Sequence, residues 1–299
     1  MMETMSSDPP LSPRGRAVRR ITVVVLLALV AATVIAFLVR EGPDGGATVA
    51  DPPAADVERT RTEQYTVDST AADRKLVQTV VRPEGDVADR PLLIFLTGKN
   101  QDPAQIGGDV MRAAVGRLGD RAPIVVLPAN DGGSYWHDRR SGRWREYVLD
   151  EAIPAALRRY DLDPARVAIG GISMGGAGAF SIAARSDRPF CAVGGHSAAF
   201  WPAWEGSAPG AYDDAEDFRR NEPMAAVLDG STRYGVPLWL DIGRSDPFVA
   251  ANRQVADALR RNGEQVTARF PSGDHDGAYW RAHMADWLAF YADALADCA

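Results

Sequence analysis

The chain has 299 residues, of which 46% are hydrophobic, and it carries a formal net charge of -7 at pH 7. This length is sufficient for one large domain with an extensive core, and the acidic balance excludes the basic footprint of a nucleic-acid-binding protein. The sequence shows no glycine-rich phosphate loop and no metal-ligand spacing, so we expect no metal, no cofactor and no nucleic acid partner.

An uninterrupted apolar stretch occupies residues 21–39, directly after a segment with four arginines. Its length matches a single bilayer span and exceeds the roughly 7 to 15 residues of a signal-peptide core. The positive-inside rule then places residues 1–20 in the cytoplasm. We therefore expect a single-pass signal anchor in the cell membrane, with the rest of the chain extracytoplasmic. Cleavage near Thr48-Val49-Ala50 is the alternative, and it would give a secreted protein.

Residues 40–61 are rich in Gly, Pro, Asp and Ala, which is typical of a flexible linker. A single folded domain, to which the candidate catalytic residues described below belong, is expected to span residues 62–299. Its strand-like runs alternate with helical patterns, which favours an α/β fold with a mostly parallel central sheet and helices on both faces. These runs lie at 76–81, 92–96, 124–127, 167–169, 192–194, 238–242 and 266–270.

Three connecting regions could border a site. Residues 97–102 follow the most strand-like run and begin Thr97-Gly98-Lys99. Residues 130–144 form an aromatic and basic connection. It is either the rim of a substrate-binding site or a solvent-exposed loop without a role in binding. Residues 200–221 have several aromatic residues but no clear period, and we expect them to form a lid or cap. The candidate rim residues are Trp136, His137 and Arg139, together with His196, which follows the apolar run at 191–195.

The segment Gly171-Ile172-Ser173-Met174-Gly175 has the G-x-S-x-G pattern of a nucleophile elbow. A short apolar run precedes it and a helix-compatible run of small residues follows it, so the motif lies in the strand, turn and helix context that it requires. Ser173 is therefore the candidate nucleophile, and a structural glycine-rich turn is the alternative. The backbone N–H groups of Met174 and Lys99 are candidate oxyanion donors, although Gly98-Lys99 could equally be a plain turn with a solvated lysine.

A serine nucleophile needs a histidine base and a carboxylate that orients it, and α/β-hydrolases present them in the order Ser, acid, His. His275 follows the last expected strand in a loop and fits the base; His196 and His137 remain alternatives, and His283 falls inside a helical pattern. Asp246 follows the strand-like run at 238–242 and fits the acid. It could also cap the following helix, and Asp241 is its rival.

The sequence has two cysteines, Cys191 in an expected buried strand and the penultimate Cys298. We expect one buried thiol and one free terminal thiol, while a disulfide is permitted by an exported location.

The segments at 163–176, 239–248 and 270–280 resemble the α/β-hydrolase branch that contains esterase D (S-formylglutathione hydrolase), the feruloyl esterases and the antigen 85 mycolyltransferases. The resemblance covers residues 62–297. One position departs from the pattern of this branch, and another distinguishes its esterases from its mycolyltransferases. Thr97-Gly98 stands where many members have His-Gly, and Asp246 matches the esterases rather than the mycolyltransferases, which use glutamate.

The residues and the resemblance together predict a serine carboxylesterase that forms an acyl-enzyme intermediate on a small-molecule, lipid or polysaccharide ester. An acyltransferase that moves the acyl group to a sugar or lipid hydroxyl is the alternative within enzymes. A catalytically silent surface-binding domain on the same fold is the alternative of another class.

Overall fold

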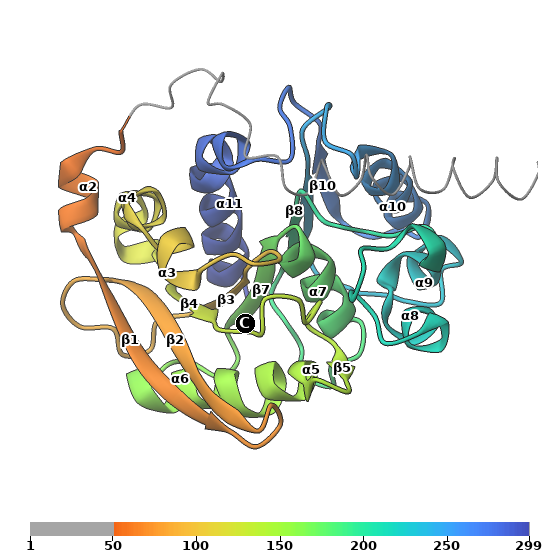
Figure 1. Cartoon of the computed structure of the whole chain (residues 1–299). Helices are drawn as coiled ribbons and strands as arrows, with labels where there is room; N and C mark the ends of the chain where they lie inside the picture. Colours follow the sequence, from red (N-terminus) through yellow and green to blue (C-terminus); the bar gives the residue numbers. More distant parts are fainter. Residues whose placement is uncertain (1–50, 299) are drawn as a thin grey trace, which may run out of the picture. The chain divides into compact units, whose positions relative to one another are not determined.

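An eight-stranded sheet with the strand order β1-β2-β4-β3-β7-β8-β9-β10 forms the centre of the computed structural model, which describes residues 51–298 (Figure 1). The strands of this sheet are β1 Thr60–Ser69, β2 Arg74–Pro83, β3 Leu92–Leu96, β4 Ile124–Pro128, β7 Val167–Ile172, β8 Val193–His196, β9 Leu238–Asp241 and β10 Val266–Arg269. A separate two-stranded ribbon consists of β5 Asp138–Arg139 and β6 Gly142–Arg143.

Helices connect most of these strands. They are α2 Ala54–Glu58, α3 Pro103–Ile106, α4 Asp109–Leu118, α5 Trp144–Glu146, α6 Ile153–Tyr160, α7 Met174–Ala183, α8 Ala215–Asn221, α9 Pro223–Leu228, α10 Val249–Arg261 and α11 Gly277–Ala296. The π-helical segment η2, Tyr147–Ala152, joins α5 to α6, and two short 3-10 segments are η1 Gly119–Arg121 and η3 Trp204–Gly206.

Six strands, from β4 to β10 in the sheet order, run parallel, whereas β1 and β2 form an antiparallel hairpin that continues the sheet at one edge. A parallel sheet is covered on both faces, so its central strands are expected to be apolar. Strands β3, β4 and β7 are buried at every residue. This confirms the predicted α/β-hydrolase-like architecture.

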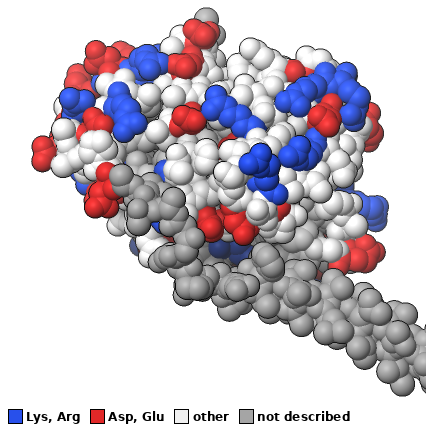
Figure 2. All heavy atoms as spheres, turned by 90° about the horizontal axis from the view of Figure 1, so that it is seen from above, with Lys and Arg blue, Asp and Glu red and all other residues white. Residues whose placement is uncertain are grey.

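Side chains of β3 alternate between the two faces of the sheet, as the period of a strand requires. Ile94 belongs to the core on the face covered by α6, α7 and α10, whereas Phe95 belongs to the core beneath α4 and α11. Helices α4 and α11 pack against each other on that second face (Figure 1). On the face of the molecule shown in Figure 2, basic and acidic side chains are interspersed with uncharged ones.

Each of the seven predicted strands is present, and each end agrees with the prediction to within three residues. Strand β1 was not predicted. It lies at the edge of the sheet, and most of its residues are charged or polar, so it lacks the apolar run by which the other strands were identified. Helix α2 and the start of β1 precede residue 62, where we expected the catalytic domain to begin.

The apolar stretch at 21–39 lies outside the described residues, as does the linker up to residue 50. Within residues 51–298, no helix is long and apolar enough to cross a membrane.

The expectation of two free thiols was wrong, because Cys191 and Cys298 form a disulfide. Helix α11 crosses one face of the sheet and ends beside the start of β8, which brings the two Cα atoms to 5.6 Å. That separation lies within the usual range for a disulfide. The sequence could not show this approach, because the two cysteines are 107 residues apart.

A loop of 107 residues closed by a disulfide should contribute about 5 kcal/mol to the free energy of unfolding in the chain-entropy model. We therefore expect Cys298→Ala to lower that free energy by about 2 to 5 kcal/mol in urea titrations. Reduced wild-type protein is the control, and its free energy of unfolding should equal that of the variant. Equal stability of the oxidised protein and the variant would contradict the assignment.

Candidate active site

Ser173 occupies the turn between β7 and α7 with φ +55° and ψ -117°, a conformation that few non-glycine residues adopt. Backbone hydrogen bonds hold it there: its N–H donates to the His196 carbonyl at 2.8 Å, and its carbonyl accepts from Ala177 and Ala199. The side chain therefore projects from the N-terminus of α7 at the carboxyl edge of the sheet, and the residue is 9% exposed.

The two glycines of the motif are required by close backbone packing. A Cβ at Gly171 would lie 2.3 Å from the Leu96 carbonyl oxygen, and a Cβ at Gly175 would lie 2.0 Å from the same atom. These distances are far below van der Waals contact, so any side chain would separate α7 from β3. The glycines thus fix the position of Ser173 against the end of β3.

His275 and Asp246 complete a hydrogen-bonded line with Ser173. His275 Nε2 lies 2.9 Å from Ser173 Oγ, and its Nδ1 lies 2.7 Å from Asp246 Oδ2. The Asp246 side chain is buried, whereas that of His275 is 18% exposed. Because Asp246 can only accept, His275 donates its Nδ1 proton to Asp246 and presents Nε2 as an acceptor for the serine hydroxyl.

The loops that carry Asp246 and His275 are bound to each other by their backbones. Arg244 N–H donates to the Pro271 carbonyl at 2.8 Å, and Ser245 N–H donates to the Gly273 carbonyl at 2.9 Å. A Cβ at Gly243 would lie 2.3 Å from that Gly273 oxygen, so this approach requires glycine. The second oxygen of Asp246, Oδ1, accepts the Phe248 N–H at 2.9 Å ahead of α10, so the acid and turn-forming roles coexist.

The loop after β3 passes directly over Ser173. A Cβ at Gly98 would lie 3.2 Å from Ser173 Cβ. Lys99 N–H has no acceptor among the described residues, and Met174 is the first residue of α7, so its N–H has no partner within the helix. Of the two candidate oxyanion donors, Met174 directly follows Ser173 in the chain, and Lys99 follows Gly98, where the loop approaches Ser173.

Three aromatic residues around His275 were not predicted as site residues. The ring centroid of Phe248 lies 5.2 Å from that of His275, and the Trp280 centroid lies 5.4 Å away in an edge-to-face arrangement. Trp201 packs edge-on against Phe248 at 4.9 Å. The position of Phe248 two residues after Asp246 and of Trp280 five after His275 was the only available signal.

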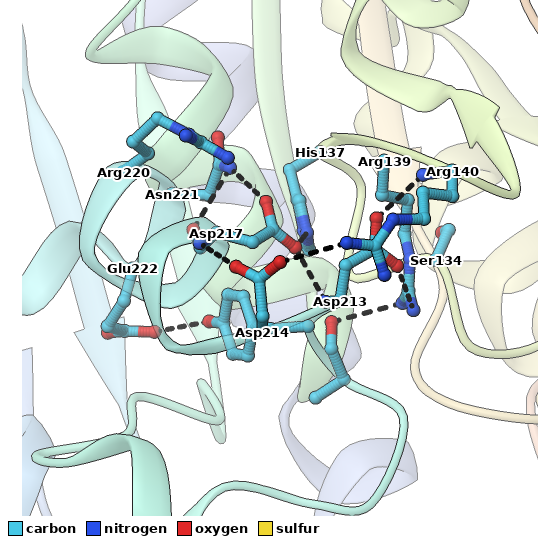
Figure 3. A network of polar contacts seen from close by, with 12 residues as sticks. Ser134, His137, Arg139, Arg140, Asp213, Asp214, Asp217, Arg220, Asn221 and Glu222 are labelled. Atoms are coloured by element: carbon cyan, nitrogen blue, oxygen red, sulfur yellow. Dashed lines mark hydrogen bonds and ion pairs between the residues drawn. The ribbon is translucent and has the colours of Figure 1, made fainter.

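The predicted rim interpretation of Trp136, His137 and Arg139 was wrong, because Trp136 and His137 are buried and the Arg139 side chain is only 10% exposed. Figure 3 shows His137 and Arg139 within a network of polar contacts. Trp136 Nε1 donates to the Thr97 carbonyl at 3.1 Å, and His137 Nε2 lies 3.0 Å from Asp217 Oδ2. Arg139 donates to three backbone carbonyls and pairs with Asp213 at 3.2 Å.

These contacts join the 130–144 connection to the segment at 210–222. Asp217 also accepts from the Asp213 N–H at 2.8 Å and from Asn221 Nδ2 at 2.7 Å. Burial alone would raise the pKa of Asp217, but the hydrogen bonds from His137, Asp213 and Asn221 lower it to about 2. The segment expected to be a lid is therefore fastened to its neighbour by buried, charge-assisted hydrogen bonds.

His196 does not line the site either, because it is fully buried. Its Nδ1 lies 2.7 Å from Asp241 Oδ1 and its Nε2 lies 2.9 Å from the Tyr291 hydroxyl. Burial lowers the pKa of His196. Asp241, the rival acid, also accepts hydrogen bonds from Trp239 and Tyr279, so both alternatives belong to a separate buried network. His283, as expected, lies in a helix, where its Nδ1 is 2.8 Å from the Tyr279 carbonyl.

Comparison with known proteins gives one family. Residues 69–291 match the Esterase family, whose description reads "Putative esterase". A curated relative, the iron(III) enterobactin esterase of Dickeya dadantii (strain 3937), is 30% identical over 215 residues, which are 67% of this chain and 48% of the relative. The chain thus spans about half the length of that relative.

Solved structures share the fold. A ferulic acid esterase superposes with a TM-score of 0.68 at 24% identity, covering 79% of this chain and 99% of its own. An S-formylglutathione hydrolase from Agrobacterium tumefaciens gives 0.67 at 19% identity, with 83% and 99% covered. MPT51 of Mycobacterium tuberculosis gives 0.61 at 18% identity, with 79% and 99% covered. The resemblance inferred from the motifs is confirmed.

One buried carboxyl in the 210–222 region has no charged partner within hydrogen-bonding distance. Glu222 accepts from the Tyr212 hydroxyl at 2.7 Å and from the Met224 N–H at 3.2 Å. Burial raises the pKa of Glu222 to about 7 in spite of these bonds. The ionised form of Glu222 is therefore disfavoured in the folded state. At pH values where this carboxyl ionises only in the unfolded chain, ionisation lowers the free energy of unfolding.

We expect the free energy of unfolding to fall between pH 4.5 and about 7, where the unfolded state loses the Glu222 proton and the folded state keeps it. The size should be about 3 kcal/mol, because each pKa unit corresponds to about 1.4 kcal/mol. Urea titrations should show that Glu222→Gln loses this decline, whereas the exposed control Glu216→Gln retains it. An unchanged pH dependence in Glu222→Gln would contradict the assignment.

Proposed function

The chain belongs to the Esterase family of ester-hydrolysing enzymes, and on that premise we propose that it is a serine carboxylesterase whose catalytic triad is Ser173, His275 and Asp246. The observation that carries the proposal is the continuous hydrogen-bonded line from Ser173 Oγ through the His275 ring to Asp246, with separations of 2.9 and 2.7 Å. These are working distances for a nucleophile, a base and the group that orients the base.

In the proposed cycle, His275 Nε2 takes the proton of Ser173 as Oγ attacks the ester carbonyl carbon. The Met174 and Lys99 N–H groups stabilise the oxyanion, and Asp246 stabilises the imidazolium. The carbonyl re-forms as the bond to the alcohol oxygen breaks, and His275 returns its proton to that oxygen. Water then attacks the acyl-enzyme with the same base, which releases the carboxylic acid and restores Ser173.

Short acyl esters of small molecules, such as p-nitrophenyl acetate or butyrate, are the proposed substrates for a first assay. The relatives' names support an ester substrate, since one is an iron(III) enterobactin esterase and another a ferulic acid esterase. Asp246 supports hydrolysis over acyl transfer, because the mycolyltransferases that this branch resembles use glutamate. The intact geometry of the three residues argues against a silent binding domain.

We place the catalytic domain outside the cytoplasm, held by the apolar stretch at 21–39. The Cys191–Cys298 disulfide supports this location, since structural disulfides persist in oxidising compartments. A cleaved signal, giving a secreted enzyme, is the competing outcome.

Ser173→Ala should abolish hydrolysis of p-nitrophenyl butyrate, and His275→Ala should lower kcat by several orders of magnitude, because triad members act as a unit. His283→Ala is the matched control, since this histidine lies on α11 and its hydrogen bond goes to the Tyr279 carbonyl rather than to a triad residue, and it should keep activity within a few-fold of wild type. An active Ser173→Ala enzyme would refute the proposed nucleophile.

Full-length protein should fractionate with membranes, and protease added to spheroplasts should release an active domain by cutting within residues 41–50. A carbonate wash distinguishes an integral from a peripheral protein. Soluble protein that begins near Asp51 would establish a cleaved signal, and protection from added protease would place the domain in the cytoplasm.

A further inference from the structure

We propose that Gln101 is a positioning residue for the oxyanion hole, and this inference rests on the proposed serine esterase function. Gln101 follows Gly98-Lys99-Asn100 in the loop that passes over Ser173. It contacts Gly98 through both its side chain and its backbone, and these two contacts determine the direction of the Lys99 N–H.

The side chain of Gln101 holds the Thr97-Gly98 peptide, the first peptide of the loop. Gln101 Oε1 accepts the Gly98 N–H at 2.6 Å. A Cβ placed on Gly98 would lie 2.9 Å from Gln101 Oε1 and 3.2 Å from Ser173 Cβ, so the carboxamide and the nucleophile border the same small space. Gly98 is needed here because a side chain would displace one of them.

The backbone contact fixes the next peptide. Gln101 N–H donates to the Gly98 carbonyl at 3.2 Å, which closes a turn with Asn100 in the left-handed region at φ +57°. The Gly98 carbonyl and the Lys99 N–H belong to one trans peptide and point in opposite directions. Because the carbonyl is turned toward Gln101, the Lys99 N–H is turned out of the loop, and it has no acceptor among the described residues.

The far side of the loop is anchored separately. Asn100 N–H donates to the Gly132 carbonyl at 2.8 Å, and Thr97 Oγ1 accepts from Asn130 Nδ2 at 3.2 Å. These bonds hold the ends of the loop but leave the Gly98-Lys99 peptide free to rotate. Gln101 restrains the peptides on both sides of Gly98: its backbone N–H holds the Gly98-Lys99 peptide, and its side chain holds the Thr97-Gly98 peptide. Glycine has little conformational restraint of its own, so loss of the side-chain bond should let Gly98 rotate and turn the Lys99 N–H away from the oxyanion.

Gln101→Met tests this role, because methionine has a similar length and lacks the acceptor for the Gly98 N–H. With p-nitrophenyl butyrate we expect kcat to fall about 10- to 100-fold, part of the loss that removal of an oxyanion donor causes, while KM changes little. The Ki of phenylboronic acid, whose tetrahedral adduct mimics the transition state, should rise by a similar factor. Gln105→Met on the exposed side of α3 is the matched control and should leave both values unchanged.

Gln101→Glu provides a second test should the methionine variant fail to fold. Glutamate keeps an acceptor for Gly98, but its carboxylate opposes the oxyanion. The ratio of its kcat to that of wild type should therefore fall as pH rises through the carboxylate pKa.

Wild-type kcat and boronate Ki in a folded Gln101→Met enzyme, or a pH-independent ratio for Gln101→Glu, would overturn the role of Gln101 alone. Retained activity in Ser173→Ala would instead overturn the proposed function. The two failures are therefore distinguishable.

Discussion

The close packing of α7 against the end of β3 is the constraint on which the site depends. With glycine at 171 and 175, the turn after β7 can approach the Leu96 carbonyl, and Ser173 is held at positive φ by three backbone hydrogen bonds. Backbone strain of this kind costs of order 1 to 3 kcal/mol and persists only where the surroundings enforce it. Here the buried strands β3, β7 and β8 enforce it, so a change in the sheet core would also shift Ser173, the proposed nucleophile.

The parallel sheet explains why distant residues meet at Ser173. Strands β3, β7, β8 and β9 all end at one edge, where their loops carry Lys99, Ser173 and Asp246, and the loop after β10 adds His275. The deeper residues at this edge serve a different purpose. His196 and Asp241 pair directly across β8 and β9, and their hydrogen bonds with Tyr291 and Tyr279 join the sheet to α11.

Local patterns in the sequence were sufficient for most of the fold and for the central residues of the site. Ser173, Asp246 and His275 each follow a strand-like run, so their position at one sheet edge could be inferred without knowing the strand order. Burial could not be inferred in this way. Trp136, His137 and Arg139 occupy a polar, aromatic stretch that would suit an exposed rim. The partner of Trp136 is nevertheless Thr97, and those of His137 and Arg139 lie up to 80 residues away in the 210–222 segment. The disulfide and the Gln101 contact were missed for related reasons: one depends on where α11 ends, and the other on side-chain geometry within a turn.

The most direct test of the central claim is detection of the acyl-enzyme. Protein mixed rapidly with p-nitrophenyl butyrate and quenched in acid should carry one butyryl group, and tandem mass spectrometry of its peptides should place that group on Ser173. Nitrophenol should appear in a burst stoichiometric with the enzyme wherever deacylation is slower than acylation. A butyryl group on another residue, with Ser173 unmodified during turnover, would contradict the account.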